Sequence, residues 1–375
     1  MVVSDVRERG DQSHPGSGPA FDLVASKLRR PATRPGTIHR SSLIDRLARP
    51  DCGPIVSVVA PAGYGKTTLL AQWAEHYPHA FAWVSVDEKD NDPKVLLTYI
   101  AAALDAVQPV GGPVFDALAS PVSSVPDSVV PRLGAELASL TAPVVLVLDD
   151  VHLLHNPEGQ AALSMLADHV PAGSQLVLAG RAEPPLRIAR LRAEGRITEI
   201  GPGDLSLTPE EAASLLRDAH LVLGHDEVAE LHQRTEGWPA GLYLAALCLR
   251  EGGSVARAVA SFGGDDRLVS EYLEAEFLAR IRVRHREFLT RTAVLERMSG
   301  SLVESVLEVP GSATTLAELA RSNLLLVPLD RRRSRAAPAP PRTAVRTSAP
   351  APRSGSGTPA ARERSGRAVP IPRTR

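Results

Sequence analysis

The segment from Ile55 to Glu75, IVSVVAPAGYGKTTLLAQWAE, constrains the fold more than any other part of the sequence. A short apolar run leads into a loop with Gly63 and Gly65, and a helical pattern follows the loop. This order matches the Walker A pattern G-x-x-x-x-G-K-[ST], except that Ala60 replaces the first glycine. Glycines let the loop turn its backbone N–H groups inward, and the helix adds the positive end of its dipole. The segment therefore predicts a strand, a phosphate-binding loop and a helix.

The side chains after the glycines predict how this loop holds a nucleotide. Lys66 can reach the β- and γ-phosphates, Thr67 can place its hydroxyl on Mg²⁺, and Thr68 can contact the α-phosphate. A glycine-rich turn without a ligand is the alternative, but strand, lysine, threonine pair and helix coincide here in the required order. The loop residues expected to bind nucleotide are Ala62, Gly63, Tyr64, Gly65, Lys66, Thr67 and Thr68.

A second apolar run supplies the acids that a P-loop needs. The run VVLVLDDVH ends in Asp149 and Asp150. Asp149 is the expected Mg²⁺ partner through water, and Asp150 is the candidate for polarising an attacking water. The predicted catalytic residues are thus Lys66 and Asp150, and the predicted metal-binding residues are Thr67 and Asp149. Acids that cap a helix or lie in a solvated turn are the alternative interpretation.

Apolar runs alternate with helical patterns from Phe21 to about Ile200, which predicts an α/β fold with a mostly parallel sheet covered by helices. The expected strands are residues 55–60, 80–86, 144–149, 175–179 and 197–200. The expected helices between them are residues 67–76, 94–106, 127–140, 158–169 and 186–194.

After Gly201 the pattern becomes helical. Thr208 is an expected N-cap, with Pro209 at the first helical position and Glu211 completing a capping box. Further helices are expected at residues 226–235, 239–250, 268–281, 284–295 and 315–323, and a strand at 324–329.

The composition changes from Arg331 onward. Residues 331–375 hold 12 arginines, eight prolines and one acidic residue, Glu363, for a net charge of +11. Because the whole chain has a formal charge of −1, the first 330 residues carry −12. The tail lacks a hydrophobic period and is predicted to be disordered, as are residues 1–20.

Apolar runs stay well below the roughly 20 residues that span a bilayer, and the first residues lack the apolar core of a secretory signal. We therefore expect a cytoplasmic protein with no membrane partner.

Seven segments in order resemble the signal-transduction ATPases with numerous domains, specifically the large ATP-dependent LuxR-type transcriptional regulators of the maltose-activator type. The resemblance covers Leu23 to Asp330. The segments are SKLRRPATRPGTIHRSSLIDRL, APAGYGKTTLLAQW, AWVSVDEKDND, LVLDDVHLL, LVLAGRAEPPLRIARLRAEGRITEI, LSLTPEEAASLL and TEGWPAGLYLAAL. The resemblance implies a P-loop domain over 21–203, a helical domain over 204–265 and a winged-helix-like domain over 266–330. These would act as a switch that binds ATP or ADP with Mg²⁺ and is at most a slow ATPase.

The resemblance also implies roles for residues outside the loop. Ile38 and Arg40 would flank the adenine, Arg181 would sense the γ-phosphate, and Pro239 would press on the base. The alternatives are an ordinary surface or helix-facing arginine at 181, and a simple helix stop and restart at Gly237 to Pro239. The acidic segment after the second strand also resembles the family, although a solvated charged loop is the favoured interpretation. Its acids are Asp87, Glu88, Asp90 and Asp92.

Members of this family continue into a sensor domain that reads an inducer and a helix-turn-helix domain that binds DNA, and they can self-associate when ATP is bound. Neither domain is visible after Asp330, so the favoured expectation is a truncated or frame-shifted member without sequence-specific DNA binding. The strand at 324–329 would then lack its hairpin partner. A stand-alone P-loop ATPase whose genuine basic tail binds nucleic acid nonspecifically is the alternative. A small-molecule kinase is disfavoured because no arginine cluster of a substrate lid is present.

Overall fold

The computed structural model describes residues 18–34, 36–49, 51–250, 255–264, 266–295, 297–321, 326–328 and 334–336. The two segments predicted to be disordered therefore lie outside the described residues, apart from 18–20 and 334–336. Among the described residues, no helix is both long enough and apolar enough to cross a membrane.

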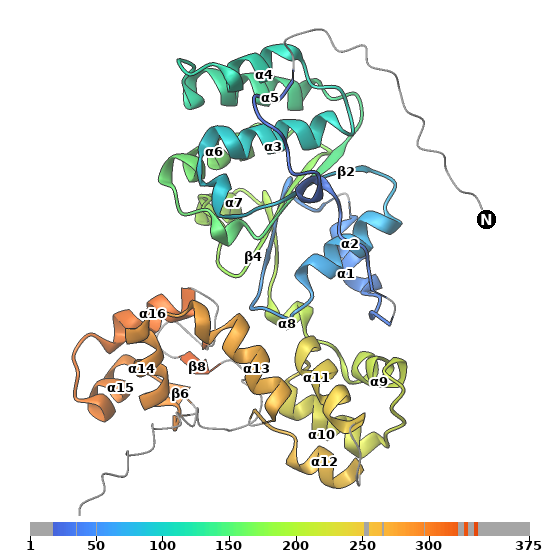
Figure 1. Cartoon of the computed structure of the whole chain (residues 1–375), viewed down its shortest axis with the longest axis vertical. Helices are drawn as coiled ribbons and strands as arrows, with labels where there is room; N and C mark the ends of the chain where they lie inside the picture. Colours follow the sequence, from blue (N-terminus) through green and yellow to red (C-terminus); the bar gives the residue numbers. More distant parts are fainter. Residues whose placement is uncertain are drawn as a thin grey trace, which may run out of the picture. The chain divides into compact units, whose positions relative to one another are not determined.

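A five-stranded parallel sheet forms the first part of the fold, as predicted (Figure 1). Its strands are β1 (Ile55–Val59), β2 (Ala80–Ser85), β3 (Val144–Asp149), β4 (Gln175–Gly180) and β5 (Ile197–Ile200). Their order in the sheet is β2-β3-β4-β1-β5, and every neighbouring pair is parallel. Parallel strands need crossover connections, which explains why helical patterns alternate with the apolar runs.

The sheet is covered on both faces because successive strand residues point to opposite sides. On β3, Val145 and Val147 belong to one hydrophobic cluster, whereas Leu146 and Leu148 belong to another. The first cluster includes residues of α1 (Ser41–Leu47) and α2 (Lys66–His76). The second includes residues of α3 (Pro93–Asp105), α4 (Gly112–Ala119), α5 (Val130–Ser139), α6 (Pro157–Ala167) and α7 (Ile188–Ala193). In Figure 1, α3 to α6 lie together on one side of the sheet, away from α1 and α2.

Several short elements were not predicted from the sequence. Besides α1 and α4, the structure has single turns at η1 (Ala25–Leu28), η2 (Glu88–Asn91) and η4 (Val151–Leu153). The predicted helix at 127–140 instead begins with a wide turn, η3 (Val125–Val129), that leads into α5. Segments this short carry too few residues for a hydrophobic period to stand out.

A helical part follows the sheet. It comprises α8 (Pro202–Leu205), α9 (Pro209–Asp218), α10 (His225–Thr235), α11 (Pro239–Arg250) and α12 (Val255–Ser261). The predicted capping box of α9 is present, because Glu211 N donates to Thr208 Oγ1 at 3.2 Å and Thr208 N donates to Glu211 Oε2 at 2.9 Å. Leu216, Leu231 and Leu242 lie in the separate core that these helices share.

The last described part combines helices with a small antiparallel sheet. Its helices are α13 (Arg267–Glu276), η5 (Leu278–Arg280), α14 (Val283–Thr292), α15 (Gly300–Leu307) and α16 (Ser312–Arg321). Its strands are β6 (Arg297–Met298), β7 (Leu326–Pro328) and β8 (Ser334–Ala336), in the order β6-β8-β7.

The expectation that the strand near 324–329 lacks a partner was wrong. Val327 of β7 pairs with Arg335 of β8, which also pairs with Arg297 of β6. A strand ladder uses backbone N–H and C=O groups, so an arginine-rich composition did not prevent residues 334–336 from forming the central strand.

The interpretation of the acidic segment as a solvated loop was wrong for Asp90. Its side chain is fully buried, and Lys27 Nζ lies 2.6 Å from Asp90 Oδ1 and 4.1 Å from the ring centroid of Tyr99. Asp87 and Asp92 cap η2 and α3 through their side chains. A distant lysine thus compensates the buried charge, which the local sequence does not reveal.

Candidate functional site

The loop between β1 and α2 has the backbone conformation that its glycines predict. Gly63 and Gly65 have φ values of 78° and 80°, a region that side-chain-bearing residues rarely adopt. α2 begins at Lys66, so the first N–H groups of the helix border the loop. The loop can therefore present backbone donors to an anion.

Lys66 lies inside the loop rather than in solvent. Its ammonium donates to the carbonyl oxygens of Ala60 at 2.9 Å and Pro61 at 3.0 Å, and 8% of the residue is exposed. Burial lowers the pKa of Lys66 to about 8, and the nearby charge of Asp150 partly opposes this. A buried cation held by carbonyl oxygens alone is well placed to exchange them for phosphate oxygens.

The side chains of Thr67 and Asp149, which are predicted to hold Mg²⁺, lie next to each other. Thr67 Oγ1 donates to Asp149 Oδ2 at 2.6 Å. Asp149 is 3% exposed, and burial, followed by the charge of Asp150, raises its pKa to about 6. A hydroxyl and a carboxylate at this separation are the oxygen donors that Mg²⁺ prefers, so these residues fit the ion.

Asp150 lies at the edge of this cluster. Its φ of 62° is left-handed, its backbone N–H donates to Asp149 Oδ1 at 3.0 Å, and its side chain is 49% exposed. The carboxylate of Asp150 is thus more accessible to water than that of Asp149.

The segment that contains Pro239 lies directly on the P-loop. Trp238 Nε1 donates to the carbonyl of Ala62, and Ala240 N donates to the carbonyl of Gly63, each at 3.1 Å. A Cβ atom on Gly63 would lie 2.5 Å from the Cβ of Ala240. The Gly-Trp-Pro sequence does separate α10 from α11, but it also clamps the loop.

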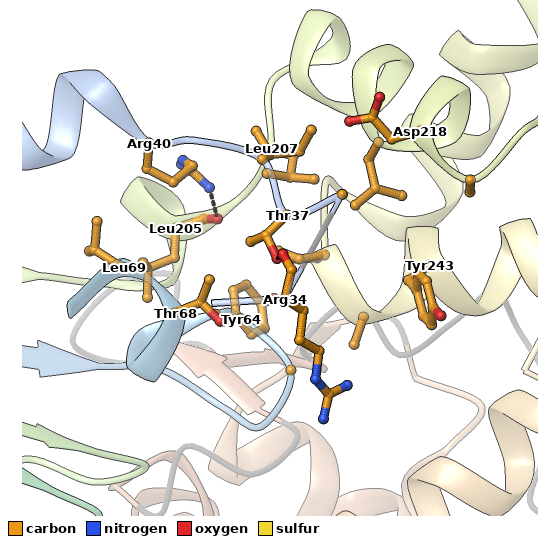
Figure 2. A pocket seen from close by; sticks show the side chains of 18 of the residues that line it. Arg34, Thr37, Arg40, Tyr64, Thr68, Leu69, Leu205, Leu207, Asp218 and Tyr243 are labelled. Carbon is orange, nitrogen blue, oxygen red and sulfur yellow. Dashed lines mark hydrogen bonds between the residues drawn. The ribbon is translucent and has the colours of Figure 1, made fainter. Parts of the chain in front are cut away.

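A cavity of about 510 Å³ opens beside the loop (Figure 2). Gly63 and Gly65 of the loop line it, together with five further residues predicted to bind nucleotide. These are Ile38, Arg40, Tyr64, Thr68 and Pro239. The cavity thus continues from the phosphate loop to the residues expected around the base, and its size fits a nucleotide.

Sequence reasoning missed the lining that comes from the helical part. Leu205, Leu207, Asp218 and Tyr243 border the cavity, and Tyr243 is 52% exposed (Figure 2). The tyrosine lies among the apolar residues that precede Arg250 in α11, which is a signal that could have been noticed.

Arg40 lines the cavity, but its guanidinium is engaged elsewhere. Nη1 donates to Leu205 O at 2.6 Å (Figure 2). Nη2 donates to Asp204 O at 2.7 Å, and Nε lies 3.3 Å from Glu211 Oε1. Burial lowers the pKa of Arg40, while Glu211 and Asp204 oppose that effect. Arg40 therefore ties the start of α1 to the α8–α9 connection, a contact that the sequence did not predict.

Arg181 forms an ion pair with a residue that the sequence analysis did not identify. Its Nη2 donates to Glu276 Oε2 at 2.6 Å, and its Nη1 donates to the backbone carbonyl of Glu276 at 2.8 Å. Glu276 is the last residue of α13. Arg181 follows β4 directly, and β4 lies between the strands that carry the P-loop and Asp149. The side chain of Arg181 is only 13% exposed and faces the end of α13, which agrees with the helix-facing alternative rather than with a surface arginine. The role of Arg181 toward a γ-phosphate stays a prediction.

Comparisons with known proteins agree with this architecture. The AAA ATPase domain family matches residues 41–178, and the MalT winged helix domain family matches residues 274–337, beyond the predicted domain end at 330. The HTH-type transcriptional regulator MalT of Serratia proteamaculans is 33% identical over 313 residues, which cover 82% of this chain and 34% of that protein. The MalT regulator of Klebsiella pneumoniae is 32% identical with the same coverage. The chain spans about a third of the length of these relatives.

A solved structure shows the same fold. The Walker-type ATPase of Pyrococcus abyssi superposes with a TM-score of 0.55 at 15% identity, covering 85% of this chain and 98% of that one. The chain thus contains an AAA-type P-loop ATPase domain and a MalT-like winged-helix domain, and it is homologous to MalT transcriptional regulators. The resemblance inferred from the sequence is confirmed.

Proposed function

From this homology, we propose that the chain binds ATP and ADP with Mg²⁺ at the P-loop and serves as the nucleotide-controlled switch of a transcriptional regulator. One observation carries the proposal. The buried Lys66 and the Thr67–Asp149 pair lie at the loop that borders a nucleotide-sized cavity. Phosphate, metal and base sites therefore follow one another in the order that a nucleotide requires.

Each side chain at the loop would have its own role in binding the nucleotide or in hydrolysis. Lys66 would exchange the carbonyls of Ala60 and Pro61 for oxygens of the β- and γ-phosphates, which favour its protonated form. Thr67 and Asp149 would hold Mg²⁺, which supplies positive charge to the phosphates when bound. Asp150 is the candidate for orienting and polarising water, because its carboxylate is half exposed beside the metal site.

The base would lie in the cavity near Ile38, Tyr64 and Pro239. The proline begins α11. Its neighbours on either side, Trp238 and Ala240, hydrogen-bond to the P-loop and so fix the distance of Pro239 from it. Water would be the phosphate acceptor, and hydrolysis, slow as the resemblance implies, would reset the switch.

The role in transcription rests on the relatives. These relatives are HTH-type transcriptional regulators, and this chain matches about a third of their length. We propose that nucleotide exchange in the described domains is coupled to gene regulation.

Titration calorimetry with Mg-ADP and with a non-hydrolysable Mg-ATP analogue tests the proposal. Lys66→Ala should abolish binding of both nucleotides, because it removes the cation inside the loop. Lys89→Ala, which alters an exposed lysine, is the matched control and should bind like the wild type. Unchanged affinity in Lys66→Ala would contradict the proposed site.

A further inference from the structure

A charged residue at the C-terminal end of α13 contacts the ATPase domain. Arg181 donates to both the carboxylate and the backbone carbonyl of Glu276. The two residues are 95 positions apart in sequence. Both side chains are largely shielded, with 13% of Arg181 and 31% of Glu276 exposed. A charge-assisted contact that is partly removed from water is stronger than a surface ion pair.

This contact belongs to the phosphate end of the site. Arg181 directly follows β4, the strand that lies between β1, which leads into the P-loop, and β3, which ends at Asp149. From the same helix, Tyr272 places its hydroxyl 2.8 Å from the position of a Cβ on Gly63. One face of α13 therefore lies against the P-loop, with Glu276 directed at Arg181.

We propose that Glu276 determines whether this site prefers a nucleoside diphosphate or a triphosphate, by competing with the terminal phosphate for Arg181. The proposal rests on the proposed nucleotide site. A guanidinium offers one planar fork, and carboxylate and phosphate oxygens suit it equally well. A diphosphate leaves the Arg181–Glu276 pair intact, whereas a γ-phosphate must share Arg181 and meets the negative charge of Glu276.

A consequence for α13 follows from thermodynamic linkage. If the Arg181–Glu276 contact weakens triphosphate binding, then triphosphate binding must weaken the contact by the same factor. α13 is the first helix of the last described part, and it leads through η5 into α14. Loss of the contact would thus release the start of that part when ATP replaces ADP.

The affinities of Mg-ADP and Mg-AMPPNP for the full chain test the selectivity. Glu276→Gln removes the charge but keeps the size of the side chain. It should tighten AMPPNP binding roughly tenfold and leave ADP binding within about twofold. Glu274→Gln removes a charge from the exposed side of the same helix and should change neither affinity. Glu276→Asp, with its shorter reach, should change the ratio in the same direction by a smaller factor.

Two outcomes separate the inference from the proposed function. Equal changes for both nucleotides, or no change, in Glu276→Gln and Glu276→Asp would overturn the role of Glu276, provided that ADP binding still requires Lys66. ADP binding that is absent or independent of Lys66 would instead contradict the nucleotide site itself.

Hydrogen exchange supplies a readout that does not depend on affinity. In the wild type, backbone amides of Arg267–Glu276 should exchange faster with AMPPNP than with ADP. In Glu276→Gln the two nucleotides should give the same exchange rate. Slower exchange with AMPPNP in the wild type would also overturn the proposed competition.

Discussion

Thr67 and Asp149, which are 82 positions apart in sequence, are joined by a hydrogen bond of 2.6 Å. Thr67 belongs to the first turn of α2 after β1, and Asp149 is the last residue of β3. β4 lies between β1 and β3 in the sheet. Because parallel strands end at the same edge of a sheet, the side chains of Thr67 and Asp149 still meet at that edge.

Asp149→Asn should weaken the Mg²⁺-dependent part of nucleotide binding. The amide lacks the negative charge that favours the ion, although it can still accept the hydrogen bond of Thr67. We expect ADP affinity in Mg²⁺ to fall roughly tenfold, while ADP affinity in EDTA changes by less than about twofold. Calorimetry in the two buffers measures both values, with the exposed Asp116→Asn as control. Equal losses in both buffers would remove Asp149 from the metal site.

The stability of the metal-free protein should depend on pH through Asp149. Burial, and then Asp150, raise its pKa to about 6 from 3.8. The folded state therefore holds this proton more tightly than the unfolded chain, and stability falls as the pH rises from about 4 to about 6. The wild type should lose this stability as the pH rises, whereas Asp149→Asn should not. The difference in unfolding free energy between variant and wild type should therefore shift by about 1.4 kcal/mol in favour of the variant from pH 5 to pH 7.5.

Urea unfolding in EDTA at the two pH values measures this gain. The control Asp116→Asn should have the same unfolding free energy as the wild type at both pH values. A difference between Asp149→Asn and the wild type that stays constant with pH would contradict the raised pKa.

Trp238→Phe should affect the nucleotide site as well as the stability of the fold. The substitution removes the indole N–H that donates to Ala62 O in the P-loop. Trp83→Phe is a matched control, because Trp83 is also buried and its indole N–H donates to Ser85 Oγ at 3.1 Å. Both variants should lose about 1 to 3 kcal/mol of stability, and ADP affinity should fall in Trp238→Phe alone. Equal ADP affinities in the two variants would show that the clamp is not needed for binding.

Lys27→Met should destabilise the fold by about 3 kcal/mol, because it leaves the fully buried carboxylate of Asp90 without its cation. The backbone N–H of Asp87 would remain as a donor to Asp90, at 2.7 Å. Urea unfolding at neutral pH measures the loss. Lys89→Met, an exposed lysine of the same acidic segment, should cost less than about 0.5 kcal/mol. Similar losses for the two lysines would mean that the buried pair contributes little.

The sequence by itself determined the elements whose signals are local. The strands of the parallel sheet, the P-loop glycines, Lys66 and the Thr208 capping box were predicted because apolar period, turn conformation and capping depend on neighbouring residues. The order of strand, loop and helix also placed Thr67 and Asp149 at one edge of the sheet. Short helices such as α1 and α4 escaped prediction because a single face of two turns has too few apolar positions.

Only the tertiary structure decided which distant charges meet. Lys27 with Asp90 and Arg181 with Glu276 join segments whose spacing carries no pattern, and each pair depends on how separate elements pack. The same holds for β8, whose pairing uses backbone groups that every sequence possesses. Local chemistry could therefore name the candidate phosphate and metal ligands, while the partner of Arg181 required the packing of α13 against the P-loop.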